Sequence, residues 1–471
     1  MRILLADPPR KEQYYDLSYP NIGILYLISY LREHYQGELQ VRYLEGQASL
    51  NDHLTAIAQF KPDIYGMSFA LWTARLAQRT IDAVKERYPE LITICGGPQP
   101  TADYAEVLAK SKVDYCCLGE GEQTFLEFVR AVERGERDMS GVPGLAWRGP
   151  DGAPELSPKR AFIKSLDDIP LPAWDLVDFA KYPGMHIHQA SPQTHLLVSR
   201  GCPFDCNFCA NAVWKYNKPW VRLRSPQNVA LEVELLYQRG IREIYMTSDE
   251  FNVSAKWALE VCAALEKLGH RDLYFQCNVR ADIVTPELAQ AFKRINLWMV
   301  HLGIESGNQA TLDGIGKHVT LPQIEAACRA FKAEGLSIFG FVMLFHAWEE
   351  DGRLRWEGPT EVDNTFRFCR KLLSRKLIDY MSWQVATPMP GSRLWQIAQR
   401  HSLVPDKTIE DVWSQNMLLP GVCEDQVKAK LRKGMLLKNF YLLKNGKINL
   451  RHGDRIWRNL KVLLGGRLSK A

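Results

Sequence analysis

The sequence predicts an α/β protein in which a doubly wound parallel sheet is followed by an open, partial (βα)6 barrel and a helical, basic C-terminal region. Two observations support this prediction. Short apolar runs alternate with amphipathic stretches in two separate series, and a stretch rich in Pro, Gly and Asp divides the series. The 471 residues suffice for several domains that each bury a core. We place the domains at residues 1–140 and 191–400, a linker at 141–190 and the basic region at 401–471.

The first series alternates strands and helices, which is typical of a parallel sheet covered on both faces. The expected strands are Arg2–Ala6, Val41–Tyr43, Asp63–Ser68, Leu91–Cys95 and Tyr115–Leu118, and the expected helices are Gly23–Glu33, Ala74–Tyr88, Thr101–Ala109 and Glu122–Val132. Breaks follow the strand ends near Pro8, Ser68, Gly97 and Glu120. Because ligands of doubly wound folds bind outside the carboxyl ends of the strands, we expect a ligand to contact these loops.

The second series begins at His195 and contains about six strand–helix units. The expected strands are Leu196–Ser199, Glu243–Thr247, Leu273–Asn278, Met299–Ile304, Ile338–Leu344 and Met381–Thr387, and the expected helices are Val229–Arg239, Ala255–Leu268, Pro286–Arg294, Pro322–Glu334 and Val362–Leu373. A closed barrel of this type needs eight units, so an open partial barrel is expected.

The composition is 46% hydrophobic and 24% charged, which excludes a fibrous or wholly disordered chain. No apolar run approaches the roughly 18 residues that span a membrane. The stretch Ile3–Ala6 is too short for the apolar core of a signal peptide. Most of the eleven cysteines are scattered among apolar neighbours, unlike the framework of a disulfide-rich secreted domain. We therefore expect a cytoplasmic protein.

Positive charge is concentrated at the C-terminal end. The chain carries a net charge of +5, whereas residues 428–471 contain thirteen Lys or Arg against Asp454 alone, giving +12. Such a region suits an anionic membrane surface, a nucleic acid or an acidic substrate, or it is simply a solvated helical face. Because no recognised nucleic-acid motif accompanies it, we expect no nucleic-acid partner. Peripheral attachment to an anionic membrane remains an expectation.

Three cysteines form a compact motif directly after the first strand of the second series. Cys202, Cys206 and Cys209 have the spacing C-x3-C-x2-C. Three thiolates can bind three irons of a [4Fe–4S] cluster and leave the fourth iron open, whereas ordinary electron carriers use four cysteines. A structural zinc site needs four ligands, usually as two cysteine pairs, and the sequence has no second pair. We therefore favour a cluster over zinc and over a purely structural role.

This spacing at the start of a βα series resembles the signature of the radical S-adenosylmethionine (SAM) superfamily. The resemblance implies a partial barrel whose [4Fe–4S] cluster binds the amino and carboxylate groups of SAM at its open iron. It also implies that one electron from the cluster cleaves SAM to methionine and a 5′-deoxyadenosyl radical. An external donor such as flavodoxin or ferredoxin is the expected source of that electron.

The resemblance further implies four SAM-binding residues. Phe208 matches the aromatic position beside the adenine, and Glu250 matches the acidic segment that holds the SAM ammonium. Arg280 is placed to pair with the SAM carboxylate, and Glu305 ends the strand where the family has polar contacts to SAM. Phe208 could instead be a core aromatic, and each charged residue could make a structural ion pair.

The first domain resembles the cobalamin-binding domain that precedes the barrel in one large subgroup. The matching segments are Asp7–Pro9, Gly96–Pro98 and Asp114–Phe125, together with the linker segment Asp168–Asp175. The resemblance implies that the loops around Pro8, Ser68, Gly97 and Glu120 cradle cobalamin. The D-x-H-x-x-G motif, which supplies a histidine to cobalt in some cobalamin proteins, is absent. The resemblance therefore implies that cobalamin binds without a histidine lower ligand. The alternatives are that this member has lost cobalamin, or that the domain serves only for contact or assembly.

From this resemblance we expect a cobalamin-dependent radical SAM enzyme, and specifically a C-methyltransferase that acts on a small-molecule or lipid-like substrate. One SAM would supply the methyl group through cobalamin, and a second would supply the radical. The alternatives are an oxidative cyclase or a carbon–carbon coupling enzyme on the same scaffold, and a non-catalytic iron–sulfur redox or nucleic-acid-binding protein. The sequence identifies no catalytic acid or base. The charged insertion Glu349–Glu357 is either an exposed loop or part of a substrate entrance.

Overall fold

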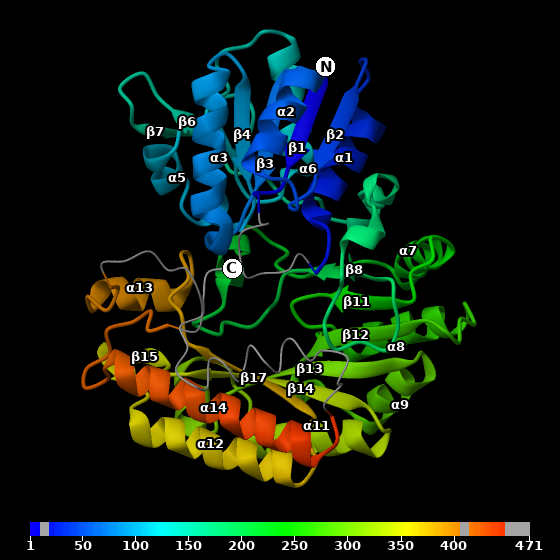
Figure 1. Cartoon of the computed structure of the whole chain (residues 1–471), viewed down its shortest axis with the longest axis vertical. Helices are drawn as coiled ribbons and strands as arrows, with labels where there is room; N and C mark the ends of the chain where they lie inside the picture. Colours follow the sequence, from blue (N-terminus) through cyan, green and yellow to red (C-terminus); the bar gives the residue numbers. More distant parts are fainter. Residues whose placement is uncertain (10–17, 406–413, 448–471) are drawn as a thin grey trace.

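The computed structural model describes residues 1–9, 18–405 and 414–447. Figure 1 shows two α/β domains, with a sheet flanked by helices in the upper half and an open barrel with helices on its outer side in the lower half. The predicted fold class, two parallel-sheet domains in tandem followed by a C-terminal helix, is confirmed.

The first sheet has the strand order β2-β1-β3-β4-β5-β6-β7. Its parallel strands are β1 (Arg2–Ala6), β2 (Gln40–Leu44), β3 (Ile64–Ser68), β4 (Ile92–Gly96) and β5 (Tyr115–Cys117). The helices are α1 (Ile22–His34), α2 (Leu50–Phe60), α3 (Ala74–Arg87), α4 (Pro98–Ala102), α5 (Tyr104–Lys110) and α6 (Gly121–Glu133). This order reverses direction between β1 and β3, which is where ligands of such folds bind.

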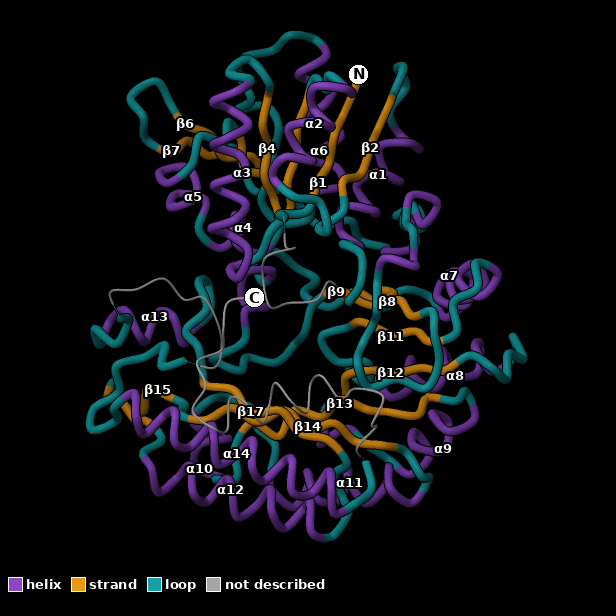
Figure 2. The backbone as a smooth tube through the Cα atoms, in the orientation of Figure 1, coloured by secondary structure: helices purple, strands orange, loops and turns teal. Residues whose placement is uncertain are grey.

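Both faces of this sheet are buried, as is usual for parallel sheets. Successive residues of β1 alternate between two cores, with Ile3 and Leu5 in one and Leu4 and Ala6 in the other. Helices α1 and α6 pack together over the first core, and the second contains Ile57 of α2 and residues of α3. Figure 2 shows the strands of this sheet with helices on both sides.

The first sheet continues past residue 140, where we placed the end of the first domain. Strand β6 (Leu145–Arg148) pairs antiparallel with β5, and β7 (Pro154–Leu156) pairs antiparallel with β6. These two strands are too short for their periodicity to be visible in the sequence. Further along the linker, Trp174 is fully buried and its indole nitrogen donates to Glu232 of α7 (Pro226–Gln238) at 2.8 Å. The linker therefore packs against the barrel as an ordered segment.

The second sheet is open and wholly parallel, with the order β17-β14-β13-β12-β11-β8. Its strands are β8 (Gln193–Leu197), β11 (Glu243–Thr247), β12 (Tyr274–Val279), β13 (Leu297–Glu305), β14 (Ser337–Leu344) and β17 (Tyr380–Val385). Its main helices are α7 (Pro226–Gln238), α8 (Ala255–Glu266), α9 (Pro286–Arg294), α11 (Leu321–Ala333) and α12 (Pro359–Ser374). Because β17 and β8 do not pair with each other, the barrel is partial, as predicted.

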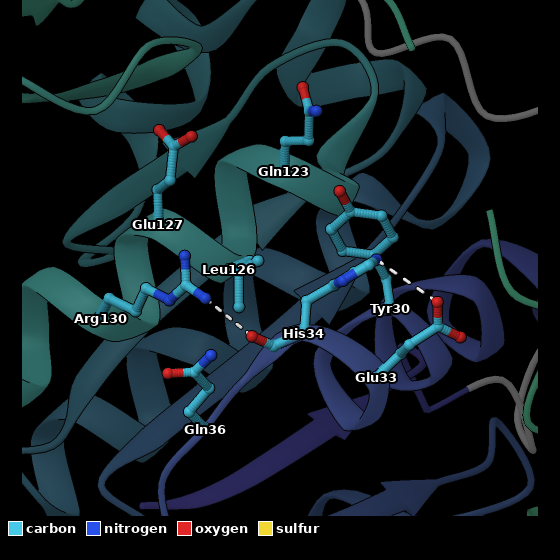
Figure 3. Close-up of a pocket in the computed structure, with 8 residues that line it drawn as sticks. All are labelled: Tyr30, Glu33, His34, Gln36, Gln123, Leu126, Glu127 and Arg130. Atoms are coloured by element: carbon cyan, nitrogen blue, oxygen red, sulfur yellow. Dashed lines mark hydrogen bonds and ion pairs between the residues drawn. The ribbon is translucent and has the colours of Figure 1, made fainter. Parts of the chain in front are cut away.

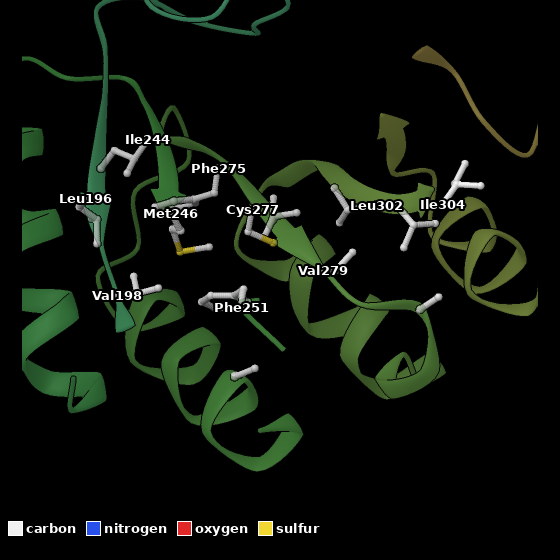
Figure 4. Packing of buried hydrophobic residues seen from close by; sticks show 14 of the residues in the cluster. Leu196, Val198, Ile244, Met246, Phe251, Phe275, Cys277, Val279, Leu302 and Ile304 are labelled. Carbon is white, nitrogen blue, oxygen red and sulfur yellow. The ribbon is translucent and has the colours of Figure 1, made fainter. Parts of the chain in front are cut away.

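The barrel core lies between the strands and the outer helices. Figure 4 shows Met246, Phe251, Cys277 and Ile304 among the side chains of this core. All four are buried, and Cys277 packs as a small apolar residue, as expected for the scattered cysteines. The packed strands give a rigid support for the loops at their carboxyl ends.

Several short elements were missing from the sequence prediction. They are α2, α10 (Gln309–Gly314), the pair β9 (Ser199–Arg200) and β10 (Arg222–Leu223), and the hairpin of β15 (Ala347–Glu350) and β16 (Arg353–Trp356). The hairpin occupies the charged insertion, which is therefore not an irregular loop. Its two-residue turn is Asp351-Gly352, and both residues have the positive φ that such a turn requires.

The C-terminal region adds α13 (Arg393–Arg400) and α14 (Glu424–Lys444), and α14 packs on β17 and α12. Residues 406–413 and 448–471 of the predicted basic region lie outside the described residues. Among the described helices, none is long and apolar enough to cross a membrane.

A buried ion pair within the barrel holds Glu232, the residue that binds Trp174 of the linker, and gives a test of the fold. The side chains of Arg224 and Glu232 are 3% and 0% exposed, and Arg224 donates to Glu232. Replacing Arg224 with Met should lower the free energy of unfolding by about 3–5 kcal/mol, because a buried carboxylate then lacks its cation. The exposed Arg329–Glu325 pair is the control, and Arg329→Met should cost less than about 1 kcal/mol. Equal losses in urea unfolding would contradict this account.

Candidate functional site

A cavity lies between the two domains at the carboxyl ends of the first sheet. From the first domain it is lined by residues such as Gly66, Ser68 and Gly97, and from the barrel by residues such as Ser199 and Asp249. With its open mouth it encloses about 1470 Å³. It borders the switch point between β1 and β3, so a large ligand held there contacts both domains.

Two glutamates at the start of α6 bind two arginines of the barrel across this interface. Arg200 donates to Glu122 at 2.5 Å, and Arg222 donates to Glu120 at 2.9 Å. Burial alone raises the pKa of Glu122, but attraction to Arg200 and the hydrogen bond from it outweigh burial, and the pKa is lowered. Arg200 also lies 5.3 Å from the centre of the Tyr26 ring. These contacts hold the first domain over the strand that leads into the cysteine motif.

The three cysteines lie on the loop that follows β9. Gly201 opens this loop with φ of +85°, and a Cβ at this position would lie 1.6 Å from the main-chain oxygen of Trp220. Only glycine fits there, which explains its place directly before Cys202. The loop therefore leaves β9 in one defined direction.

Asn207, in the middle of the motif, fastens the cysteine loop to three other segments. Its backbone nitrogen donates to the carbonyl of Ile315 at 2.8 Å, and its side-chain nitrogen donates to the carbonyl of Ala347 at 2.8 Å. Its own carbonyl accepts from the backbone nitrogen of Leu394 at 2.7 Å. The loop is thus held by residues far apart in the sequence.

The donor set of this loop fits a cluster with an open iron. Cys202, Cys206 and Cys209 are free thiols with intermediate exposure. Burial raises the pKa of Cys202 to about 12 and that of Cys209 to about 11, so a metal is needed to stabilise the thiolates. In the described part of the chain no three His, Cys, Asp or Glu groups gather closely enough for a single metal ion. A cubane cluster makes a different demand, because each thiolate binds its own iron.

Four charged side chains gather beside Cys206, and one of them is a lysine that sequence reasoning missed. Lys317 is 5% exposed, and its Nζ lies 3.2 Å from Oε1 of Glu305. Burial alone lowers the pKa of Lys317, but Glu305 and Glu250 outweigh it and raise the pKa, so the ammonium stays charged. Burial raises the pKa of Glu250 to about 7, although Lys317 and Arg280 oppose this effect. Glu305 has φ of +60°, an uncommon conformation for a non-glycine residue.

The structure brings Glu250, Arg280 and Glu305 to this one place, but Arg280 already has protein partners. Its guanidinium stacks 3.6 Å from the centre of the Phe204 ring, lies 2.8 Å from Asp282 and donates to the carbonyl of Lys317. These contacts match the structural alternative for Arg280, and its contact with the SAM carboxylate stays a prediction. Lys317 is the second cation available for that role.

Phe208 lies beside a buried histidine that the sequence prediction also missed. The ring centres of Phe208 and His346 are 5.7 Å apart. His346 is fully buried, burial lowers its pKa to about 4, and neither ring nitrogen has a hydrogen-bond partner of acceptable geometry among the described residues. A neutral imidazole with an unused donor and acceptor next to an aromatic ring fits a nucleobase. This place therefore suits the adenine of SAM.

Three of the four residues predicted to cradle cobalamin line the interdomain cavity. Ser68, Gly97 and Glu120 line it, whereas Pro8 is buried next to Asp7 and does not. A Cβ at Gly97 would lie 2.8 Å from the carbonyl oxygen of Phe69, so glycine lets the loop after β4 pack closely against the loop after β3 at the edge of the cavity. The carboxylate of Glu120 is bound by Arg222, so its contact with cobalamin stays a prediction.

The barrel side of the cavity also fits a large polar ligand. The hydroxyl of Ser248 lines it, is buried and has no hydrogen-bond partner among the described residues. Among the described residues that line the cavity, none is a histidine. Cobalamin bound without a histidine on cobalt therefore stays the prediction.

A second depression, of about 770 Å³ with its open mouth, lies between α1 and α6 and is shown in Figure 3. Its lining is polar and includes His34, Glu127 and Arg130, and Arg130 donates to the carbonyl of His34 at 2.7 Å. It shares no residue with the interdomain cavity. It belongs to one domain only, so we place the chemistry at the cysteine loop.

Comparisons with known proteins agree with this arrangement. Residues 14–129 match the model of the B12 binding domain, and residues 196–354 match the radical SAM superfamily. An uncharacterised methyltransferase of Pyrococcus horikoshii is 31% identical over 458 residues, covering 94% of this chain and 93% of that protein. The anaerobic magnesium-protoporphyrin IX monomethyl ester cyclase of Rubrivivax gelatinosus is 29% identical, covering 84% and 70%. The solved cobalamin-dependent radical enzyme OxsB covers 98% of this chain and 70% of its own, with a TM-score of 0.73 and 19% identity.

The fold and the cysteine loop thus define a radical SAM enzyme that carries a B12-binding domain. The chain belongs to the family of cobalamin-dependent radical SAM enzymes, which includes methyltransferases and cyclases. Its cofactors are a [4Fe–4S] cluster, SAM and cobalamin.

The cluster assignment predicts a sharp difference between cysteines. Replacing Cys206 with Ala should abolish cluster assembly and reductive SAM cleavage, because one iron loses its thiolate. Cys262 and Cys328 are buried in helix packing, and their Ala variants should keep nearly all the iron. Iron and sulfide analysis of anaerobically reconstituted protein checks this. Full SAM cleavage by the Cys206→Ala protein would refute the assignment.

Lys317 should bind SAM through its charge. Lys317→Met should weaken SAM binding by about tenfold or more, since the SAM carboxylate and two buried glutamates lose a cation, and tenfold corresponds to about 1.4 kcal/mol. Lys317→Arg should restore part of the affinity. The exposed Lys256 is the control, and Lys256→Met should bind SAM normally. Calorimetry on cluster-loaded protein measures this, and normal SAM affinity of Lys317→Met would remove the residue from the site.

Proposed function

We propose that the enzyme is a C-methyltransferase that transfers a methyl group from SAM, through cobalamin, to a carbon of a small-molecule or lipid-like substrate. The observation that carries this proposal is the position of the interdomain cavity. Its lining includes Gly201, directly before Cys202, and Asp249, directly before Glu250. A methyl carrier in this cavity would lie against the segments that hold the radical source.

When bound, cobalamin supplies a transferable methyl group, and the cluster supplies the electron that cleaves SAM. The protein has three tasks around them. The cysteine loop fixes the cluster, Glu250, Glu305 and Lys317 orient the charged end of SAM, and Phe208 and His346 flank the place that suits its adenine. The ion pairs of Glu120 and Glu122 keep the first domain in place over the loop.

A second candidate function is oxidative cyclisation or carbon–carbon coupling on the same scaffold. The relative from Rubrivivax gelatinosus, named as a cyclase, favours it. Relatives named as methyltransferases or methylases favour methyl transfer, among them the hopanoid C-3 methylase of Methylococcus capsulatus at 24% identity. For either function we propose a flavodoxin or ferredoxin as the electron donor, because a cluster that loses one electron in each cycle must be reduced again.

Methyl transfer predicts a half-reaction that needs no substrate. Protein loaded with cluster and cobalamin, reduced anaerobically and given SAM with a deuterated methyl group, should pass the label to cobalamin. It should form one S-adenosylhomocysteine for each methyl group transferred. Mass spectrometry of the cobalamin pool measures this. Cobalamin that binds but never acquires the label would favour the cyclase or coupling function.

A pair of glycine variants locates the methyl carrier in the cavity. Gly97→Ala places a Cβ against Phe69 and the hydroxyl of Ser68 at positive φ, so it should lower cobalamin binding and label transfer while iron content stays normal. Gly141→Ala is the control, because a Cβ there meets no atom within 4 Å. Loss of iron in Gly97→Ala would show that the variant disturbs the whole fold instead.

A further inference from the structure

Helix α14 exposes a stripe of large apolar side chains that the proposed function does not use. Leu436, Phe440 and Leu443 are 54%, 57% and 67% exposed. Their spacing of four and three residues places them on one face of the helix. They are three of the eight large hydrophobic side chains that are exposed among the described residues. We call these three residues the apolar stripe.

The opposite face of α14 is firmly packed, so the orientation of the apolar stripe is well defined. Leu431 and Tyr441 are buried, and a Cβ at Gly434 would lie 2.7 Å from the Trp383 ring of β17. Lys430 and Lys433 bind Asp363 of α12 at 2.7 and 2.6 Å. Turning the helix to bury the stripe would break these contacts.

The charges around the apolar stripe are positive. Residues 428–447 contain seven Lys or Arg and no Asp or Glu. Arg432 and Lys444 are exposed and, from helical periodicity, lie on either side of the stripe. Four of the other five cations are paired with acids, namely Lys428 with Glu424, Lys430 and Lys433 with Asp363, and Lys447 with Asp379. An apolar face with cations along its borders is complementary to the headgroups and upper acyl chains of an anionic bilayer.

We propose that α14 docks the enzyme on the surface of an anionic lipid bilayer, with the helix axis in the membrane plane. The apolar stripe enters the interface, and Arg432 and Lys444 contact the anionic headgroups. Three apolar side chains give weak, reversible binding that depends on salt. Figure 1 shows α14 in the lower half of the molecule, beside α12 and away from the first domain, so docking through α14 leaves the first domain clear of the membrane.

The experiment is flotation of the full-length protein with vesicles of phosphatidylcholine, with and without phosphatidylserine. Wild-type protein should float with the anionic vesicles at low salt and much less at high salt. The triple variant Leu436→Ser, Phe440→Ser, Leu443→Ser should lose binding by about tenfold or more, with iron content and SAM cleavage unchanged. Leu231→Ser on α7 is the matched control, since Leu231 is 60% exposed, and it should float like wild type.

Four results would overturn the proposal. The first is wild-type protein that does not float with anionic vesicles, and the second is a triple variant that floats equally well. The third is a wild-type protein that is a dimer in ultracentrifugation and a triple variant that is a monomer but still binds vesicles. That result would assign the stripe to contact with a second copy of the chain. Vesicle binding that appears only after residues 448–471 are removed would show that the chain itself covers the stripe.

Discussion

The ion pairs between Glu120 and Glu122 of the first domain and Arg200 and Arg222 of the barrel are the interaction on which the rest of the site depends. Arg200 lies two residues before Cys202, and Glu120 directly precedes α6. The same four side chains therefore hold the start of the cysteine loop and the start of α6 in a fixed relative position. Buried charges must be paired, so a docking of the two domains that separated these pairs would be unfavourable. The interdomain cavity is a consequence of that docking.

Charge balance also organises the interior of the barrel. Two carboxylates, Glu250 and Glu305, and two cations, Lys317 and Arg280, lie beside Cys206, so charges of both signs are present in this cluster. SAM is itself a zwitterion at its amino-acid end, and its ammonium and carboxylate can replace internal pairs without leaving a buried charge unpaired. A preformed set of charges of both signs thus suits a ligand that carries both signs.

Much of the fold could be predicted from the sequence, because strands, helices and the cysteine spacing are local patterns. The loops at Ser68 and Gly97 could be predicted because breaks in the apolar pattern, with glycines at Gly96 and Gly97, follow the two strands. Lys317, His346 and Arg222 were missed because their roles depend on contacts that no local pattern records, such as the pairing of Arg222 with Glu120 across 102 residues. The only local signal for Lys317 is a glycine directly before it, in the turn after α10. Helix α2 was missed although Ser49 and Asp52 form a capping box, since polar residues interrupt its apolar face.

The central claim is that cobalamin and the cluster occupy neighbouring sites on either side of the interface set by Arg200 and Arg222. The most direct test is electron paramagnetic resonance of protein that holds reduced cluster and cobalt(II) cobalamin together. The account predicts that each paramagnetic centre broadens the signal of the other and speeds its relaxation. In the Arg222→Met variant, which disrupts the interface, this effect should be weaker. Two fully loaded centres with spectra equal to the sum of the separate signals would contradict it.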